Sequence, residues 1–185
     1  MAHVAWAASA KYVGVAKCAS SGCHGSAKLG NQKASWEESK HAEATSGLSG
    51  KKGKQYAAAL GIDDPAESDL CMSCHSTAWG VEESRLALTF DPEEGVQCEG
   101  CHGAGSDYID PHKKENADFA AVMAKGMRDL RTEKQREELC GGCHRQSDKY
   151  DKLKKSEHPK PSAAPLKELE DKMEEKKHWK EKASK

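Results

Sequence analysis

The sequence has few of the residues that fill a protein core. Only 36% of its 185 residues are apolar and 5% are aromatic, including two Phe, whereas globular domains are usually about 45–50% apolar. A chain of this composition builds a weak core from its own side chains, close to the composition of disordered proteins. The fold therefore needs apolar material from another source.

An excess of one charge and long hydrophobic runs are also missing. The chain has 29 basic and 30 acidic residues, so nothing in its net charge points to nucleic acid or to an anionic membrane as a partner. Its longest apolar stretches fall far short of the ~20 residues that a membrane-spanning helix needs. We therefore expect no transmembrane segment and no nucleic-acid partner.

The first ten residues, MAHVAWAASA, are apolar and small. They are typical of the end of a signal peptide near its cleavage site, although a basic start and a full hydrophobic stretch are missing. We interpret residues 1–10 as a residual export segment, with the export signal itself absent from the sequence.

Cysteine, in contrast, is abundant and regularly placed. The eight Cys form four close pairs, and a His follows the second Cys of every pair. Three sites read C-x-x-C-H (CMSCH, CEGCH and CGGCH), and the first reads C-x4-C-H (CASSGCH). The four motifs contain Cys18, Cys23 and His24; Cys71, Cys74 and His75; Cys98, Cys101 and His102; and Cys140, Cys143 and His144.

The adjacent His distinguishes these motifs from other close Cys pairs. Zinc sites and disulfide scaffolds do not require a His directly after each pair. Covalent haem does, because two thiols form thioethers with the haem vinyl groups and the next residue then lies beneath the iron as its axial ligand. The sequence therefore predicts four covalently bound haem c groups, which would supply the missing apolar core.

Each haem iron has a second axial position that another side chain can fill. Five His lie outside the motifs: His3, His41, His112, His158 and His178. His41 follows the first motif, His112 follows the third, and His158 follows the fourth, which makes these three the favoured distal ligands. His178 and His3 are weaker candidates. Met also binds haem iron, but no Met here stands in an obvious loop context, so two His per iron are favoured.

The remaining segments predict a mainly α fold with a haem-filled core and little or no sheet. We expect one helix over residues 31–48, capped by Ser35, and a short helix and turn within residues 51–70. Residues 80–97 are the only plausible hairpin or strand region, and residues 113–139 predict one or two helices. The expected domains are the segment 1–10, a tetrahaem domain over 11–160 and a charged helical tail over 161–185, with a helix at 166–182 after a proline-containing linker.

The order of the motifs resembles the cytochrome c-554 family, whose members carry four haems. The resemblance covers about residues 11–160. It rests on Ser35, Trp36, His41 and Ala42, on the block Gly-Val-x-Cys-Glu-x-Cys-His-Gly-x-Gly from Gly95 to Gly105, and on Tyr108 and His112. It implies a mostly helical fold, haems packed in stacked pairs, and electron transfer.

The resemblance also implies a ligand set. Three haems would have two His ligands, and the second, at His75, would lack a distal ligand from the protein. Carried over by position, the pairs are His24 with His112, His102 with His158, and His144 with His41. This chain departs from the family in its C-x4-C-H first site and in a lysine-rich tail that carries His178.

Three functions follow from these features. The favoured one is an electron carrier, not an enzyme, that passes electrons between a donor and an acceptor redox protein. The alternatives are reduction of a small molecule such as nitric oxide, nitrite or hydroxylamine at an open iron on His75, and assembly into an extracellular filament. In related filaments a neighbouring subunit donates some His ligands, a role open here to His3 or His178. Because haem attachment takes place outside the cytoplasm, we expect a periplasmic or extracellular location.

Overall fold

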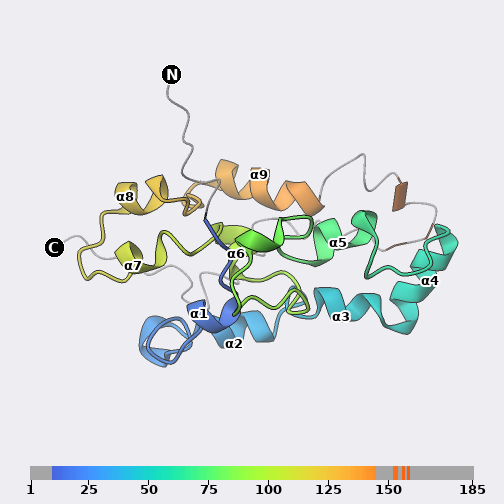
Figure 1. Ribbon diagram of the computed structural model, residues 1–185, viewed down its shortest axis with the longest axis horizontal. Coiled ribbons are helices and arrows are strands. Elements are labelled where there is room, and N and C mark those ends of the chain that lie inside the picture. Colours follow the sequence, from blue (N-terminus) through green and yellow to red (C-terminus); the bar gives the residue numbers. More distant parts are fainter. Residues whose placement is uncertain (1–9, 145–151, 154–155, 157, 159–185) are drawn as a thin grey trace, which may run out of the picture.

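The computed structural model describes residues 10–144, 152–153, 156 and 158, which form short helices joined by turns (Figure 1). Among these residues there is no strand, and one isolated bridge joins Tyr12 to Leu86. The expectation of a mainly α fold with little or no sheet is confirmed. The helices are α1 (Val15–Cys18), η1 (Ala27–Leu29), α2 (Gln32–Glu37), α3 (Ala44–Leu48), α4 (Lys51–Ala59), α5 (Asp69–His75), η2 (Glu83–Arg85), α6 (Cys98–His102), α7 (Ile109–His112), α8 (Phe119–Ala124) and α9 (Glu133–His144).

The helices are arranged along the two long sides of the molecule. In the view of Figure 1, α8 and α9 run along one long side and α1, α2 and α3 along the other. Helices α5 and α6, which carry the second and third motifs, lie between these two rows, and α4 lies at one end. Helix α3 contacts both α4 and α5, and α7 contacts α8.

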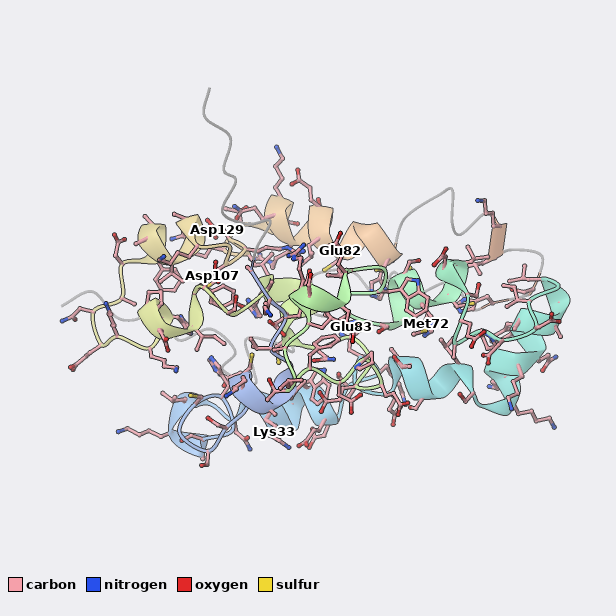
Figure 2. All side chains as sticks on the ribbon, viewed as in Figure 1. Lys33, Met72, Glu82, Glu83, Asp107 and Asp129 are labelled. Carbon is pink, nitrogen blue, oxygen red and sulfur yellow. The ribbon has the colours of Figure 1, made fainter. Side chains whose placement is uncertain are left out.

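Side chains of the protein form only a small core. The largest fully buried side chains in the described residues are Gln97, Glu99 and Val122, two of which are polar. The loop between the second and third motifs carries charged side chains such as Glu82 and Glu83, whereas Met72 of α5 is buried (Figure 2). The small core agrees with the low apolar content of the sequence.

The prediction of a single helix over residues 31–48 is wrong. The structure has two helices there, α2 and α3, separated by a turn over residues 38–43. Ser35 lies inside α2 and is not its cap; Asn31 precedes the helix instead. The break has a functional consequence, because it places His41 in the turn between the two helices.

The hairpin expected over residues 80–97 is also wrong. This segment contains η2 and turns, and instead of pairing as two strands it forms short-range turn bonds and pairs with the N-terminal segment. The amide of Tyr12 donates to the Arg85 carbonyl at 2.8 Å, and the Ala87 amide donates to the Tyr12 carbonyl at 2.9 Å. The Arg85 guanidinium also donates to the Ala10 carbonyl.

Other helices lie where the sequence predicts them. The short helix, turn and lead into the second motif within residues 51–70 correspond to α4 and the start of α5, and residues 113–139 contain α8 and most of α9. The predicted linker and the helix at 166–182 lie outside the described residues. None of the helices in the described part of the chain combines the length and apolar character needed to cross a membrane.

Candidate haem-binding site

Three of the four motifs are each built on a helix. The C-x-x-C-H sequences lie in α5, α6 and α9, and the motif His is the last residue of each helix. Residues three apart share one face of a helix, so the two Cys of each motif can reach the same ligand. The helix therefore supplies the geometry that attachment through two thioethers requires.

The first motif reaches a similar arrangement through a turn. Cys18 ends α1, and the extra residues form a turn in which the Cys23 amide donates to the Ser20 carbonyl at 2.9 Å. The His24 amide then donates to the Cys18 carbonyl at 3.2 Å. The longer C-x4-C-H spacing thus returns His24 to the first Cys of its motif.

The motifs lie close to one another in space. The thiols of Cys18 and Cys98 are hydrogen-bonded to each other. This bond, and then burial, raise the pKa of Cys18, whereas the same bond lowers the pKa of Cys98 against the opposing effect of burial. Burial, with a smaller contribution from nearby Cys140, raises the pKa of Cys101 to about 11. The third motif is therefore a neighbour of both the first and the fourth.

Three motif His each face a His from outside the motifs. The ring centroids of His24 and His112 lie 5.9 Å apart, those of His41 and His144 lie 6.0 Å apart, and those of His75 and His158 lie 6.2 Å apart. No group of three or more His, Cys, Asp or Glu side chains in the described part of the chain could hold a metal ion. The imidazoles thus meet as pairs.

The spacing of these pairs fits an iron with two axial imidazoles. A metal–imidazole bond is about 2.0–2.1 Å long, and the centre of a ring with bonds of about 1.35 Å lies roughly 1.15 Å from its nitrogen. Two imidazoles on one metal therefore have centroids about 6.3–6.5 Å apart. The three observed distances of 5.9–6.2 Å lie slightly below this range, so the residues fit the predicted cofactor.

One pairing differs from the resemblance. The structure brings together His24 with His112 and His144 with His41, as the resemblance implies, but it places His158 beside His75 rather than assigning it to His102. The ring of Tyr56, on α4, lies 5.3 Å from that of His158. A His thus faces His75 in the structure, whereas the resemblance implies no protein ligand opposite it. His3 and His178 lie outside the described residues.

Hydrogen bonds orient two of the motif imidazoles. Nδ1 of His24 lies 3.1 Å from Oε1 of Gln32, and Nδ1 of His75 lies 2.7 Å from the Ala44 carbonyl oxygen. Because both partners are acceptors, each Nδ1 carries the proton and donates it. Nε2 is then the nitrogen with a lone pair for a metal.

Hydrogen bonds from the residues just before the third motif stabilise the turn at His41. The Val96 amide donates to the His41 carbonyl at 2.9 Å, and Trp36 Nε1 donates to the Val96 carbonyl at 2.8 Å. Gly95 has φ +68°, and a Cβ there would lie 2.4 Å from the His41 oxygen. Only glycine lets the backbone at position 95 come this close to the His41 carbonyl without strain. The Gly-Val-x-Cys block therefore packs directly against the turn that carries His41.

The surroundings of two facing histidines, His41 and His112, favour their neutral form. Burial, and then the neighbouring His144, lower the pKa of His41, while burial and then His24 lower the pKa of His112. A neutral imidazole is the form that binds a metal.

Sequence reasoning missed the role of Glu99, inside the third motif. Its side chain is 1% exposed, and its carboxylate accepts hydrogen bonds from the amides of Val13, Gly14 and Gly105 at 2.7–2.9 Å. Burial raises the pKa of Glu99, and these three amides oppose that rise. The carboxylate thus joins the N-terminal segment and the loop after α6 to the third motif. An acid between two motif Cys does not by itself predict burial.

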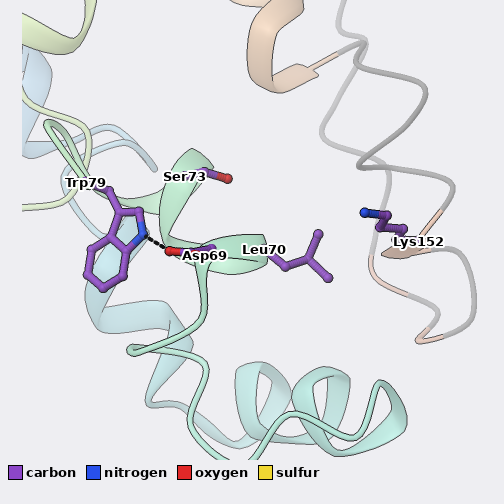
Figure 3. Close-up of a pocket in the computed structure, with 5 residues that line it drawn as sticks. All are labelled: Asp69, Leu70, Ser73, Trp79 and Lys152. Atoms are coloured by element: carbon purple, nitrogen blue, oxygen red, sulfur yellow. Dashed lines mark hydrogen bonds between the residues drawn. The ribbon is translucent and has the colours of Figure 1, made fainter. Parts of the chain in front are cut away.

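An open pocket lies beside the second motif (Figure 3). It has a volume of about 480 Å³ and is lined by Asp69, Leu70, Ser73, Trp79 and Lys152. Trp79 Nε1 donates to the Asp69 carboxylate at 2.7 Å, while Leu70 and Lys152 face each other across the gap (Figure 3). Because Leu70 precedes the motif and Ser73 lies within it, this pocket adjoins the second motif.

Comparison with known proteins agrees with this geometry. Residues 17–103 match the family model described as cytochrome c554 and c-prime. The chain is 32% identical over 151 residues to cytochrome c-554 of Nitrosomonas europaea, an alignment that covers 75% of this chain and 59% of that protein. The chain belongs to the cytochrome c-554 family. No solved structure matches the chain significantly.

Membership of the cytochrome c-554 family identifies the chain as a c-type cytochrome, in which haem c is bound covalently to the protein. The matched model covers the first three motifs, and the chain spans 59% of the length of the curated relative. The fourth motif, in α9, lies beyond the residues that the family model matches, whereas His41, which faces it, lies within them.

Proposed function

We propose that this cytochrome binds four haem c groups and transfers electrons between two redox proteins. The four Cys-His motifs would each hold one haem, and the bound iron would supply a change of one electron between ferric and ferrous states. His41, His112 and His158 would be the distal ligands of the haems at His144, His24 and His75. The donor and acceptor proteins are expected to exchange electrons with the haem edges.

The observation that carries this proposal is the set of three imidazole pairs. Each pair joins one motif His to one His from a distant segment, at centroid distances of 5.9–6.2 Å. An iron with two imidazole ligands has no coordination position left for a substrate. Axial ligands of this kind suit electron transfer, for which ligand identity, burial and hydrogen bonds are what the protein controls.

The same pairs weigh against small-molecule reduction at His75. That alternative needs an open iron at the second motif, and the ring of His158, 6.2 Å from that of His75, supports a second imidazole there instead. Tyr56 in turn contacts His158 and supports its position. The electron-carrier function is therefore the better supported of the two.

We further propose that the protein acts in the periplasm, where c-type haem attachment takes place. The filament alternative required ligands from His3 or His178 of a neighbouring subunit. Both residues lie outside the described part of the chain, and no contact of the described residues favours it over a separate carrier.

Intact-mass measurement under denaturing conditions tests the proposed haem content. The chain would be exported in a bacterial host that matures c-type cytochromes, and the mass should equal that of the polypeptide plus four haems. The double substitution Cys71→Ser and Cys74→Ser should remove one haem, while Ser73→Ala, within the same motif, should remove none. A wild-type protein with fewer than four haems would contradict the proposal.

Reduction by a second redox protein tests the proposed activity. The haem absorbance of the oxidised protein should change completely when a reduced small cytochrome is added, and should recover with an oxidised one. Exchange only with small chemical reductants, and none with a protein partner, would contradict a role as an electron carrier.

A further inference from the structure

Gln32 is placed to control one imidazole of the candidate haem sites. Its Oε1 lies 3.1 Å from Nδ1 of His24, and its Nε2 donates to the Leu29 carbonyl at 2.8 Å. The second bond distinguishes the two ends of the amide, since only the nitrogen can donate to a carbonyl. Oε1 must therefore face His24, which makes the imidazole the donor.

The backbone around Gln32 is shaped to hold this contact. Gly30 and Asn31 have φ values of +101° and +49°, and these left-handed conformations turn the chain sharply before α2 begins at Gln32. Asn is one of the few residues other than Gly that adopt this region. The Lys33 amide then donates to the His24 carbonyl at 3.1 Å, so the start of α2 is attached to His24 through both backbone and side chain.

The corresponding acceptor at the second motif is of a different kind. Nδ1 of His75 faces the backbone carbonyl of Ala44, which every residue type would provide. At His24 the acceptor is a side chain, and its chemistry depends on the residue at position 32. A stronger acceptor on Nδ1 makes the imidazole a more basic ligand, and a more basic ligand favours ferric over ferrous iron.

We propose that Gln32 is a positioning residue that fixes the tautomer of His24 and sets the reduction potential of the haem at the first motif. This inference rests on the proposed binding of haem at His24. Gln32 acts through the imidazole and does not contact the iron. A neutral amide is an acceptor of intermediate strength, between a carboxylate and no acceptor at all.

Two substitutions at this position should shift one potential in opposite directions. Gln32→Glu places an anionic acceptor on Nδ1 and should lower the midpoint potential of one haem. Gln32→Leu removes the acceptor and should raise the potential of that same haem. A merely structural role would not give opposite signs, so the pair of variants separates tuning of the ligand from a general disturbance of the fold.

The measurement is a redox titration of the four-haem protein followed by both absorbance and electron paramagnetic resonance. Gln135→Glu and Gln135→Leu are the matched controls, because Oε1 of Gln135 accepts from the amide and hydroxyl of Thr132. These controls make the same changes in charge and polarity and should leave the potentials in place. Intact mass first establishes that each variant carries haem at the first motif.

The outcomes separate this inference from the proposed function. A wild-type protein without haem at Cys18 and Cys23 would overturn the proposed function itself. Haem-loaded Gln32 variants whose potentials do not move, move in the same direction, or move for all haems equally would overturn only the role of Gln32. If Gln32→Leu fails to retain haem, the nearly isosteric Gln32→Glu is the deciding variant. A lowered midpoint potential of one haem supports the role of Gln32, and an unchanged potential rejects it.

Discussion

The imidazole rings of His41 and His144 lie 6.0 Å apart, although His41 belongs to the turn between α2 and α3 and His144 ends α9. These helices lie on opposite long sides of the molecule (Figure 1). A metal bound between the two rings would therefore connect the two rows of helices. In a chain with so few core side chains, such connections would contribute much of the stability of the fold.

Removing the ring of His41 should change one haem. In His41→Ala we expect one low-spin ferric signal to be lost and one high-spin signal to appear in the electron paramagnetic resonance spectrum, because that iron loses an axial ligand. Lys40→Ala is the matched control, since the Lys40 side chain is exposed and pairs only with Glu43 among the contacts seen. An unchanged low-spin spectrum in His41→Ala would show that His41 is not a ligand.

His158→Ala should open the iron at the second motif. The reduced variant is expected to bind one more carbon monoxide per molecule than the wild-type protein, because the position that faces His75 becomes vacant. Tyr56→Phe keeps the aromatic ring beside His158 and should bind no additional carbon monoxide. Equal binding by wild-type and His158→Ala proteins would instead favour the open second haem that the family resemblance implies.

The four motifs and their chemistry could be predicted from sequence because attachment is local. Cys and His at fixed spacing suffice to define where a covalent haem is bound, whatever the rest of the chain does. The facing histidines were partly predictable for a different reason, since His outside the motifs are scarce. Which motif His faces His158 was not predictable, because a contact between distant segments depends on how helices such as α4 and α5 pack.

Other errors had equally physical causes. Residues 31–48 have continuous helical character, but the contact of Val96 with the His41 carbonyl favours a turn at residues 38–43. Residues 80–97 are the only plausible hairpin or strand region in the sequence, yet they form turns, and the backbone around Arg85 and Ala87 pairs with Tyr12. Gln32 and Glu99 act through hydrogen bonds to residues on other segments, and no local pattern reveals such bonds.

Glu99 should contribute strongly to stability. In Glu99→Leu the buried amides of Val13, Gly14 and Gly105 lose their acceptor, and an unsatisfied buried donor costs about 1–3 kcal/mol. We expect the free energy of unfolding of the haem-loaded protein to fall by at least ~2 kcal/mol, measured by guanidinium denaturation.

Glu93→Leu is the control for this prediction, because it removes the same charge from an exposed position in the preceding loop. A loss of stability in Glu99→Leu no larger than in Glu93→Leu would mean that the three amides find other partners and that the carboxylate does not organise the third motif.

The ionised carboxylate of Asp129 should raise the free energy of unfolding at neutral pH, and this contribution should be lost in acid. The guanidinium of Arg131 donates to the Asp129 carboxylate at 2.8 and 2.9 Å, and these bonds hold the pKa of Asp129 well below its usual value. A depressed pKa in the folded state stabilises the protein above the pKa of the unfolded chain, about 3.9, and the effect is lost as the pH falls further. The Arg131 side chain is exposed and that of Asp129 is partly exposed, so solvent screens the pair and the effect is small.

Thermal unfolding of Asp129→Asn at neutral pH and near pH 3 checks this expectation. The variant should melt at a slightly lower temperature than wild type at neutral pH, and the difference should shrink in acid. Asp63→Asn, the same substitution at an exposed position, should show no such trend. A difference that stays constant with pH would rule out a contribution from the ionised carboxylate.

The most direct test of the account is the electron paramagnetic resonance spectrum of the fully oxidised wild-type protein, quantified per haem before and after addition of cyanide. If the three imidazole pairs are axial ligand pairs, at least three of the four irons should be low-spin and unchanged by cyanide. Two or more high-spin irons that react with cyanide would contradict the account, because the facing histidines would then not be ligands.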